Sequence, residues 1–170
     1  PISFDRKKAL ALFREAGWSD SDKDGVLDKV IDGKKTPLRF TLVNANPDRN
    51  KIYTVFKEDA KQVGVDINIK LVEWNSLVKL LDERNFDTVS LGWGGGSLEW
   101  DPKQIWHSSS AVVGGSNFIN YKNKDVDRWI DQARVELDAE KRKKILYKVY
   151  EQIAKDVPYI FLLNQKYSLY

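Results

Sequence analysis

The chain has 170 residues, 42% of them hydrophobic and 31% charged, which is the balance of a globular domain rather than of a disordered or collagen-like chain. Its net charge is only +3, and its 28 lysines and arginines are interspersed with 25 acids, so we expect no nucleic-acid-binding surface. The absence of cysteine excludes disulfides, thiolate catalysis and cysteine-ligated zinc.

No segment is expected to span a membrane, because apolar runs such as residues 159–163 are far shorter than the ~20 residues required. The sequence has no methionine and no recognisable signal segment at its start. We therefore expect the chain to be part of a longer protein.

The amino-terminal half alternates between helices and strands. A helix is expected between Asp5, which can cap it, and Gly17, which ends it. Residues 18–37 are rich in aspartate and glycine, which favours a loop or a short hairpin. Alternating apolar residues then predict three strands, at residues 38–42, 67–71 and 89–93.

Two helices are expected between these strands. The first has an apolar face with spacings of three and four, made of Ile52, Val55, Phe56, Ala60 and Val63. The second is entered from Asn75 as its cap. Right-handed crossovers turn such a βαβαβ pattern into a parallel sheet.

The carboxyl-terminal half is mostly helical. Asp101, followed by Pro102, is expected to cap a short helix, and longer helices are entered from Asn123 and from Asp138. Residues 159–163 are predicted to form a return strand, and residues 167–170 to begin another. The fold class is therefore α/β, with a βαβαβ core sheet, additional carboxyl-terminal helices and a return strand.

The third strand leads directly into a glycine-rich segment. Ligands of open α/β sheets bind at the carboxyl ends of strands, and glycines leave the backbone accessible to another chain. The alternative is that these glycines only permit a tight turn or bulge. A dinucleotide or phosphate loop is not supported, since no long helix follows. The candidate binding residues here are Gly92, Trp93, Gly94, Gly95, Gly96, Ser97, Glu99 and Trp100.

The side chains of this region suit binding better than catalysis. Trp93 and Trp100 are candidates for pocket walls, although Trp93 also continues a strand alternation and fits a core position equally well. Glu99 is either a solvated charge or a ligand-facing carboxylate. His107 is interpreted as a helix-end or surface residue, because its nearness in sequence to three serines does not establish catalytic geometry.

A possible calcium loop lies earlier in the chain. Its spacing matches the first half of an EF-hand, but Ile31 stands where the bidentate glutamate is required, so a true EF-hand is excluded. The alternative is an acidic surface turn. The candidate ligands are Asp20, Asp22, Asp24, Val26 and Asp28.

Several segments together resemble a known family. These are residues 89–96, the stretch from Asp101 to Ser109, and residues 115–127, with support from residues 4–18 and 138–158. In combination they resemble the carboxyl-terminal lobe of the family 5 extracellular solute-binding proteins, the dipeptide- and oligopeptide-binding components of bacterial ABC importers.

The resemblance implies a periplasmic-binding-protein-like lobe of type II, cluster C, that covers residues 1–170, with the other lobe absent. It implies that Gly92, Trp93 and Gly94 pair with the backbone of a peptide between two lobes. No enzymatic activity and no cofactor are expected, apart from the possible calcium. The resemblance further implies a periplasmic or membrane-anchored extracellular lipoprotein, with permease subunits as partners. Membrane contact is expected only through an anchor or permease outside this chain.

One position departs from the family pattern. Many peptide-binding members place an aspartate for the ligand's amino terminus where this chain has Gly96. Either Glu99 supplies that charge or the ligand is not held by a free amine. A non-peptide solute and a ligand-sensing regulatory domain therefore stay open as alternatives, while a hydrolase is less well supported.

Overall fold

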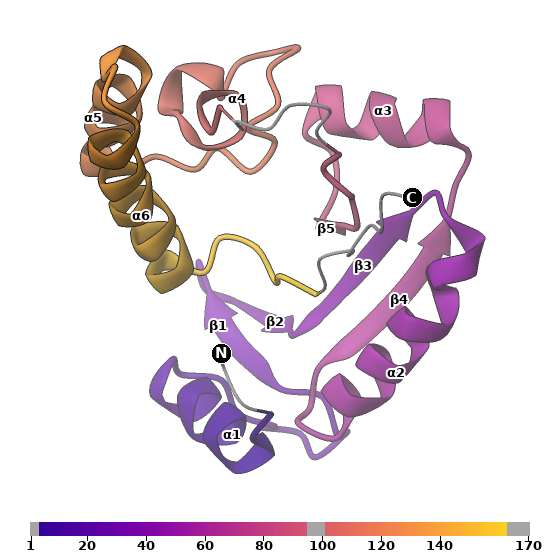
Figure 1. Cartoon of the computed structure of the whole chain (residues 1–170). Helices are drawn as coiled ribbons and strands as arrows, with labels where there is room; N and C mark the ends of the chain where they lie inside the picture. Colours follow the sequence, from indigo (N-terminus) through magenta and orange to yellow (C-terminus); the bar gives the residue numbers. More distant parts are fainter. Residues whose placement is uncertain (1–3, 95–100, 163–170) are drawn as a thin grey trace, which may run out of the picture. The chain divides into compact units, whose positions relative to one another are not determined.

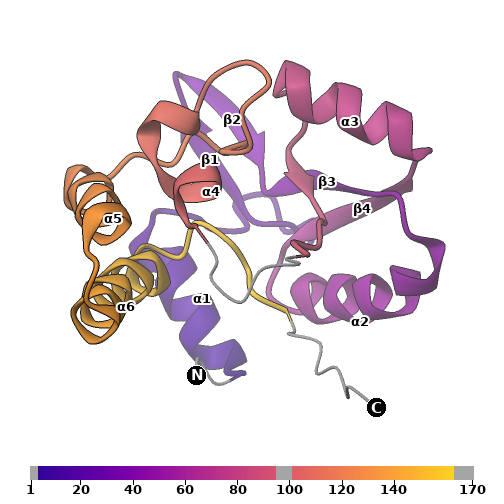
Figure 2. The ribbon, with the colours of Figure 1, turned by 45° about the horizontal axis from the view of Figure 1, so that its top comes forward.

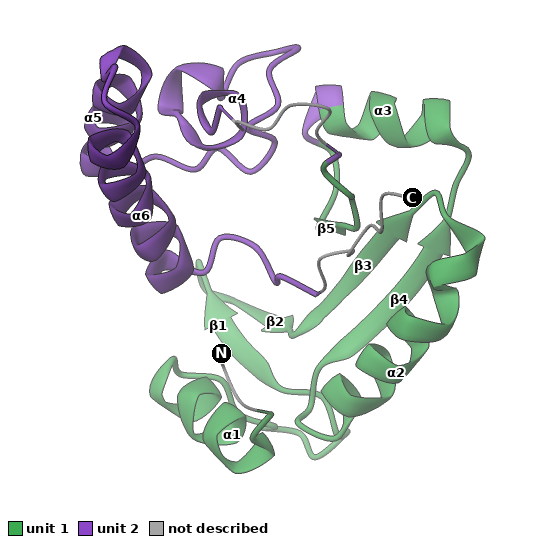
Figure 3. Cartoon of the chain, viewed as in Figure 1, with its two compact units in different colours: residues 1–81, 85–93 green, residues 82–84, 94–170 purple. Residues whose placement is uncertain are grey.

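The computed structural model describes residues 4–94 and 101–162 of the chain. The chain forms two compact units (Figure 3): residues 1–81 with 85–93, and residues 82–84 with 94–170. Within the described ranges, no helix combines the length and the apolar character needed to cross a lipid bilayer.

The first unit begins as predicted. Helix α1 (Arg6–Glu15) is capped by Asp5, whose carboxylate accepts the backbone N–H of Lys8 at 2.9 Å. The predicted hairpin is also confirmed, because β1 (Asp28–Ile31) and β2 (Lys34–Pro37) pair antiparallel. Asp32 and Gly33 form its turn, and both have the positive φ typical of tight hairpin connections.

The βαβαβ prediction is confirmed as well. Strands β3 (Arg39–Asn44), β4 (Asp66–Leu71) and β5 (Thr88–Val89) form a parallel sheet in the order β4-β3-β5. Helices α2 (Asn50–Lys61) and α3 (Trp74–Glu83) make the crossovers, with the short 3₁₀ turn η1 (Pro47–Arg49) before α2. Figures 1 and 2 show β3 and β4 running between these two helices. β3 is therefore the central strand of the sheet.

The third strand is shorter than predicted. Only Thr88 and Val89 pair with β3, after which the N–H of Ser90 donates to the carbonyl of Val43 at 2.9 Å. Because β3 ends at Asn44, it offers no partner for the later residues of the segment. Trp93 is accordingly outside the strand, and 41% of its surface is exposed.

The predicted apolar face of α2 is correct for Phe56, Ala60 and Val63 but wrong for Ile52 and Val55. Ile52 and Val55 are exposed at 43% and 63%, whereas Tyr53 is only 2% exposed. Phe56 and Ala60 pack against the cluster around Val63, Val65 and Ile67, and Tyr53 lies on that side at the same three- and four-residue spacing. Helix α3 likewise begins at Trp74, so Asn75 lies inside the helix instead of capping it.

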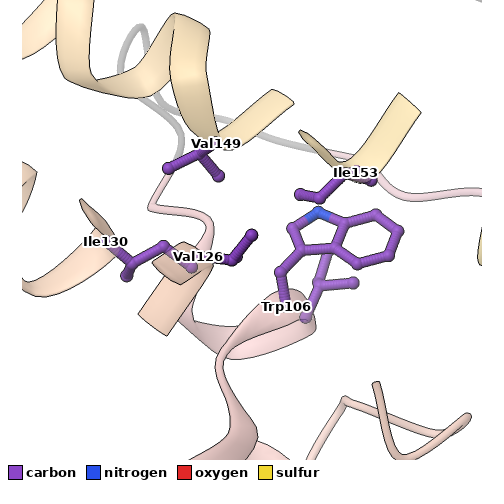
Figure 4. Close-up of a cluster of buried hydrophobic side chains, with 6 residues drawn as sticks. Trp106, Val126, Ile130, Val149 and Ile153 are labelled. Carbon is purple, nitrogen blue, oxygen red and sulfur yellow. The ribbon is translucent and has the colours of Figure 1, made fainter. Parts of the chain in front are cut away.

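The second unit is helical, with α4 (Lys103–Trp106), the 3₁₀ turn η2 (Ser108–Ser110), α5 (Lys124–Val135) and α6 (Ala139–Asp156). The predicted caps are confirmed, since Asn123 accepts backbone N–H groups of α5 and Asp138 accepts that of Lys141. Figure 4 shows how Trp106 lies among aliphatic side chains of α5 and α6. The buried core cluster consists of Ile105, Trp106, Val126, Ile130, Val149 and Ile153.

The predicted return strand is wrong for residues 159–162, which are not in a strand. Aromatic packing decides the conformation of this segment. The Tyr159 ring lies 4.6 Å and the Phe161 ring 6.4 Å from the ring of Trp106. Tyr159 packs against the helical core, whereas Phe161 is 63% exposed at its edge. Residues 163–170, which include the second predicted strand, lie outside the described residues.

Candidate functional site

The carboxyl ends of the three parallel strands define one edge of the sheet in the first unit. Asn44 ends β3 and lies opposite Leu71, the last residue of β4, while Val43 lies opposite Val89, the last residue of β5. Backbone N–H groups and helix N-termini converge at such edges, so ligands of open α/β folds bind there. The glycine-rich segment predicted to bind a ligand begins here.

The middle of this edge is rigid and polar. Asn44 is only 1% exposed, and its side-chain N–H donates to the Asn50 carboxamide oxygen at 3.2 Å. The Asn44 side-chain oxygen accepts the Asn46 N–H at 3.1 Å, and its carbonyl accepts the Val72 N–H at 2.9 Å. Asn44 thus ties the start of α2 and the loop before it through its side chain, and the exit of β4 through its backbone carbonyl.

A second buried contact holds the start of the glycine-rich segment. The hydroxyls of Tyr53, on α2, and Ser90, directly after β5, share a hydrogen bond. Together with the bond from the Ser90 N–H to Val43, this fixes Ser90 through both backbone and side chain. Gly92 follows only two residues later, so the segment leaves the sheet from a fixed point.

Gly92 and Gly94 are exposed, and local packing does not require glycine at either position. Neither has a positive φ. A Cβ added to either glycine meets no described atom within 4 Å. The tight-turn explanation, in which glycine relieves backbone strain, therefore finds no support at these two residues. Close approach of another molecule stays the prediction for these two positions.

Two tryptophans lie beyond strand ends at this edge. Trp93 follows β5 by four residues, and Trp74 follows β4 by three, where it opens α3. They are 41% and 61% exposed, and the strands that precede them lie on opposite sides of β3, about 10 Å apart. Trp93 is therefore not a core residue. Trp74 was missed from the sequence, although its place just after an alternating strand was a usable signal.

The remaining candidates of the glycine-rich segment cannot be placed. Gly95, Gly96, Ser97, Glu99 and Trp100 lie outside the described residues, so their roles stay predictions. Asp101 is described, and its carboxylate accepts the Lys103 N–H at 2.9 Å and the Arg134 side-chain N–H at 3.0 Å. Asp101 therefore contacts the first turn of α4, but Pro102 occupies the N-cap position, so the predicted cap is wrong by one residue.

His107 lies at a helix end, as predicted, but it is buried rather than on the surface. Its Nδ1 accepts the backbone N–H of Ser109 at 3.0 Å and lies 2.7 Å from the Ser109 hydroxyl oxygen. Its Nε2 lies 3.4 Å from a carboxylate oxygen of Asp131. Because Nδ1 already accepts a backbone N–H, this histidine caps the η2 turn and is poorly placed as a general base.

The predicted calcium ligands are partly brought together. Oxygens of Asp20, Asp22 and Asp28 lie within 4.8 Å of one another. Asp24 instead accepts the N–H of Val26 at 2.8 Å, which is a local turn contact. This arrangement combines the two readings of the sequence, an acidic turn and a set of oxygen ligands.

A lysine already lies among these acids. The Lys35 ammonium contacts Asp22 and lies 3.4 Å from Asp28, and these contacts lower the pKa of Asp22 and raise that of Lys35. A calcium ion at this loop would compete with that ammonium group. Calcium binding stays a prediction, and thermal unfolding followed during a calcium titration tests it.

Comparison with known proteins points to one family. Residues 1–115 match the profile described as bacterial extracellular solute-binding proteins, family 5 middle. The chain is 36% identical over 165 residues to the oligopeptide-binding protein AppA of Bacillus subtilis, an alignment that covers 95% of this chain and 29% of that protein.

Solved structures agree with this result. The structure of Bacillus subtilis AppA in complex with a nonapeptide matches 92% of this chain with a TM-score of 0.83 and 35% identity. The structure of NikZ from Campylobacter jejuni in complex with Ni(L-His) matches 92% of this chain with a TM-score of 0.78 and 28% identity. This chain covers 31% of each of the two proteins.

Proposed function

Because this chain belongs to the bacterial extracellular solute-binding proteins of family 5, we propose that it is the carboxyl-terminal lobe of the substrate-binding component of an ABC importer for peptides. The chain spans less than a third of the relatives it matches. A ligand held between two lobes therefore receives its second wall from a part of the protein outside residues 1–170, and ABC permease subunits receive the loaded protein.

The observation that carries this proposal is the open backbone at Gly92 and Gly94. An extended peptide lying along the end of β5 exchanges backbone N–H and carbonyl contacts with this segment, which is β-augmentation. Such pairing is independent of the peptide's side chains. Side chains at either glycine would stand where the guest backbone has to approach.

The exposed tryptophans supply the side-chain contacts. Trp74 and Trp93 present large flat rings on the two sides of β3, and rings of this kind accept many apolar and planar groups at low entropic cost. Peptide side chains that point away from the paired backbone are expected to contact these rings. This arrangement gives broad specificity for peptide side chains. Recognition of the ligand's termini depends on other residues.

This chain has Gly96, and not an aspartate, at the position expected to hold the amino terminus of the peptide. Glu99 supplies the negative charge in our proposal. The alternative is a solute without a free amine, and the relative that holds a nickel–histidine complex is the reason for keeping that alternative. A ligand-sensing role for the same lobe is compatible with the same binding chemistry.

Calorimetry with short peptides tests the proposal on the longer protein that contains both lobes, with this chain alone as a comparison. We expect tight binding by the longer protein and none by the isolated lobe, which offers only one wall. Peptides N-methylated at the paired nitrogens are expected to bind about tenfold more weakly for each hydrogen bond lost. Recovery of intact peptide is expected, because the family consists of binding proteins.

A matched pair of variants connects binding to the glycines. Gly92→Val has room in the folded chain but obstructs a guest backbone, so the affinity is expected to fall by at least tenfold. Ala154→Val, which also introduces a branched side chain at an exposed position of α6, is the control and leaves affinity unchanged. If neither Gly92→Val nor N-methylation of the peptide changes the affinity, the backbone-pairing proposal is overturned. Binding of metal complexes but not of peptides would favour the alternative ligand class.

A further inference from the structure

Helix α1 has four lysines and arginines against one acid, and helix α6 carries a similar excess of positive charge. Helix α6 contains six lysines and arginines against three acids, so its net charge of +3 equals that of the whole chain, and the remaining residues are balanced. The expectation that basic residues are evenly interspersed with acids therefore fails for this helix.

The charge lies on one strip of the helix surface. Lys141, Lys144 and Lys148 are spaced by three and four residues, which places them on one face, and all three are exposed. In the part of the chain that the structure describes, no ion pair neutralises any of these three ammonium groups. Lys155 continues the strip but pairs with Glu151 at 2.9 Å. We call Lys141, Lys144 and Lys148 the lysine strip.

Exposed aliphatic side chains lie beside this strip. Val135 ends α5 and is 78% exposed, and Leu137, in the turn to α6, is 94% exposed. Both line an open recess of about 440 Å³, together with Gln132, Glu136 and Ile145. Ile145 lies one turn after Lys141 and one before Lys148, so the recess borders the lysine strip.

We propose that the corner between α5 and α6 docks on the surface of a bilayer that contains anionic phospholipids. Lysines without acidic partners match phosphate headgroups in charge, and aliphatic side chains beside them can enter the interfacial layer. This combination is typical of peripheral membrane contacts. The surface adds a contact within residues 1–170 to the expected anchor or permease outside them.

A protein partner fits this surface less well. Protein interfaces are depleted in lysine and concentrate their binding energy in aromatic and arginine anchors. The strip and its apolar border offer lysine and small aliphatic residues instead. The contact is expected to be weak and reversible, because three lysines and two aliphatic side chains supply far less binding free energy than a lipid anchor combined with a second acyl chain or a basic patch.

Sedimentation with lipid vesicles tests the proposal on this chain. Vesicles of equal parts phosphatidylglycerol and phosphatidylcholine are expected to bind it at low salt, and pure phosphatidylcholine vesicles are not. High salt is expected to weaken this binding, since exposed charges are screened. Replacing all three strip lysines by glutamine is expected to weaken binding about 100-fold.

Two controls separate this surface from a general charge effect. Replacing Lys7, Lys51 and Lys61 by glutamine removes the same charge from exposed positions of the first unit and is expected to weaken binding much less. Val135→Ser with Leu137→Ser is expected to reduce the binding that survives at high salt. Equal losses in both lysine triples, or no binding to phosphatidylglycerol vesicles, would overturn the proposal.

The same experiment distinguishes a protein partner. One arm uses phosphatidylcholine vesicles that carry the cognate permease. If the chain attaches to these vesicles but not to phosphatidylglycerol vesicles, and loses attachment when the strip is neutralised, the surface belongs to the permease and the lipid assignment is overturned. The peptide proposal rests on the segment that begins at Gly92 and is tested by peptide binding, so failure of either proposal leaves the other intact.

Discussion

Tyr53 of α2 and Ser90, the first residue after β5, share a buried hydrogen bond between their hydroxyls. The bond joins the helix that covers the sheet to the point where the glycine-rich segment begins. It also accounts for a tyrosine that is 2% exposed, because the phenolic group of a buried tyrosine requires a partner. The position of the proposed binding segment thus depends on a side chain far away in sequence.

Tyr53→Phe is expected to lower the free energy of unfolding by about 1 kcal/mol, the net contribution of one buried hydrogen bond. The Ser90 hydroxyl then loses its partner, and peptide affinity is expected to fall with it because the segment after β5 is less well fixed. Urea denaturation and calorimetry measure the two effects. Tyr147→Phe removes a hydroxyl from an exposed tyrosine and is expected to change neither.

Asp28 makes the stability of the β1–β2 hairpin sensitive to acid. Its carboxylate accepts the backbone N–H of Ser21 at 2.9 Å and the Ser21 hydroxyl, and it faces Lys35, all of which lower its pKa. A lowered pKa adds stability that is complete above the ordinary aspartate pKa of about 3.9 and is lost as the pH falls through the lowered value.

Asp28→Asn is therefore expected to destabilise the chain at neutral pH and to flatten the dependence of stability on pH below about 4. Denaturant midpoints measured between neutral and acidic pH check this. Asp32→Asn is the control, because Asp32 has a φ of +50° that asparagine also adopts. An equal flattening in both variants would show that the acid sensitivity does not come from the contacts of Asp28.

Ile130 tests the core of the second unit. Its side chain is fully buried and belongs to the same cluster as Trp106 and Val149, as Figure 4 shows. Ile130→Ala is expected to cost about 2–5 kcal/mol, because it removes buried carbon atoms and leaves a cavity. Val135→Ala, in the same helix but exposed, is expected to change stability by less than about 0.5 kcal/mol. Similar losses from both changes would contradict this core assignment.

Local signals in the sequence predicted several helix starts and the succession of strands and helices along the chain. Asn123 and Asp138 cap their helices as expected, because a cap depends on only the next three backbone N–H groups. The order of strands and crossovers followed from apolar periodicity and the right-handed crossover rule. These features are determined by neighbours in the chain, so one sequence suffices to find them.

Features that depend on tertiary partners were missed. Tyr53 was left out of the buried face because its hydroxyl disfavours burial until Ser90 is known to receive it. The strand expected at residues 159–163 has strand-like composition, but the ring of Trp106 recruits Tyr159 and Phe161. The spacing of Lys141, Lys144 and Lys148 was visible in the sequence. These lysines share one face because α6 is helical throughout residues 139–156.

Part of the candidate edge was anticipated from the sequence, and its binding role stays a prediction. The position of Gly92 and Gly94 at the end of an edge strand follows from topology, and their open surroundings agree with it. Trp74 was not identified, because the carboxyl edge of a sheet collects residues from strands separated by many positions in the chain. Asn44 was assigned to a turn, whereas its buried side chain organises the edge.

Amide hydrogen exchange at residues 92 and 94, measured in the two-lobed protein with and without bound peptide, tests the backbone-pairing claim most directly. Peptide binding is predicted to slow exchange at one or both amides by at least tenfold, with no comparable change at the turn residue Gly33, which is remote in sequence. Saturating peptide that leaves exchange at both amides unchanged would contradict the account.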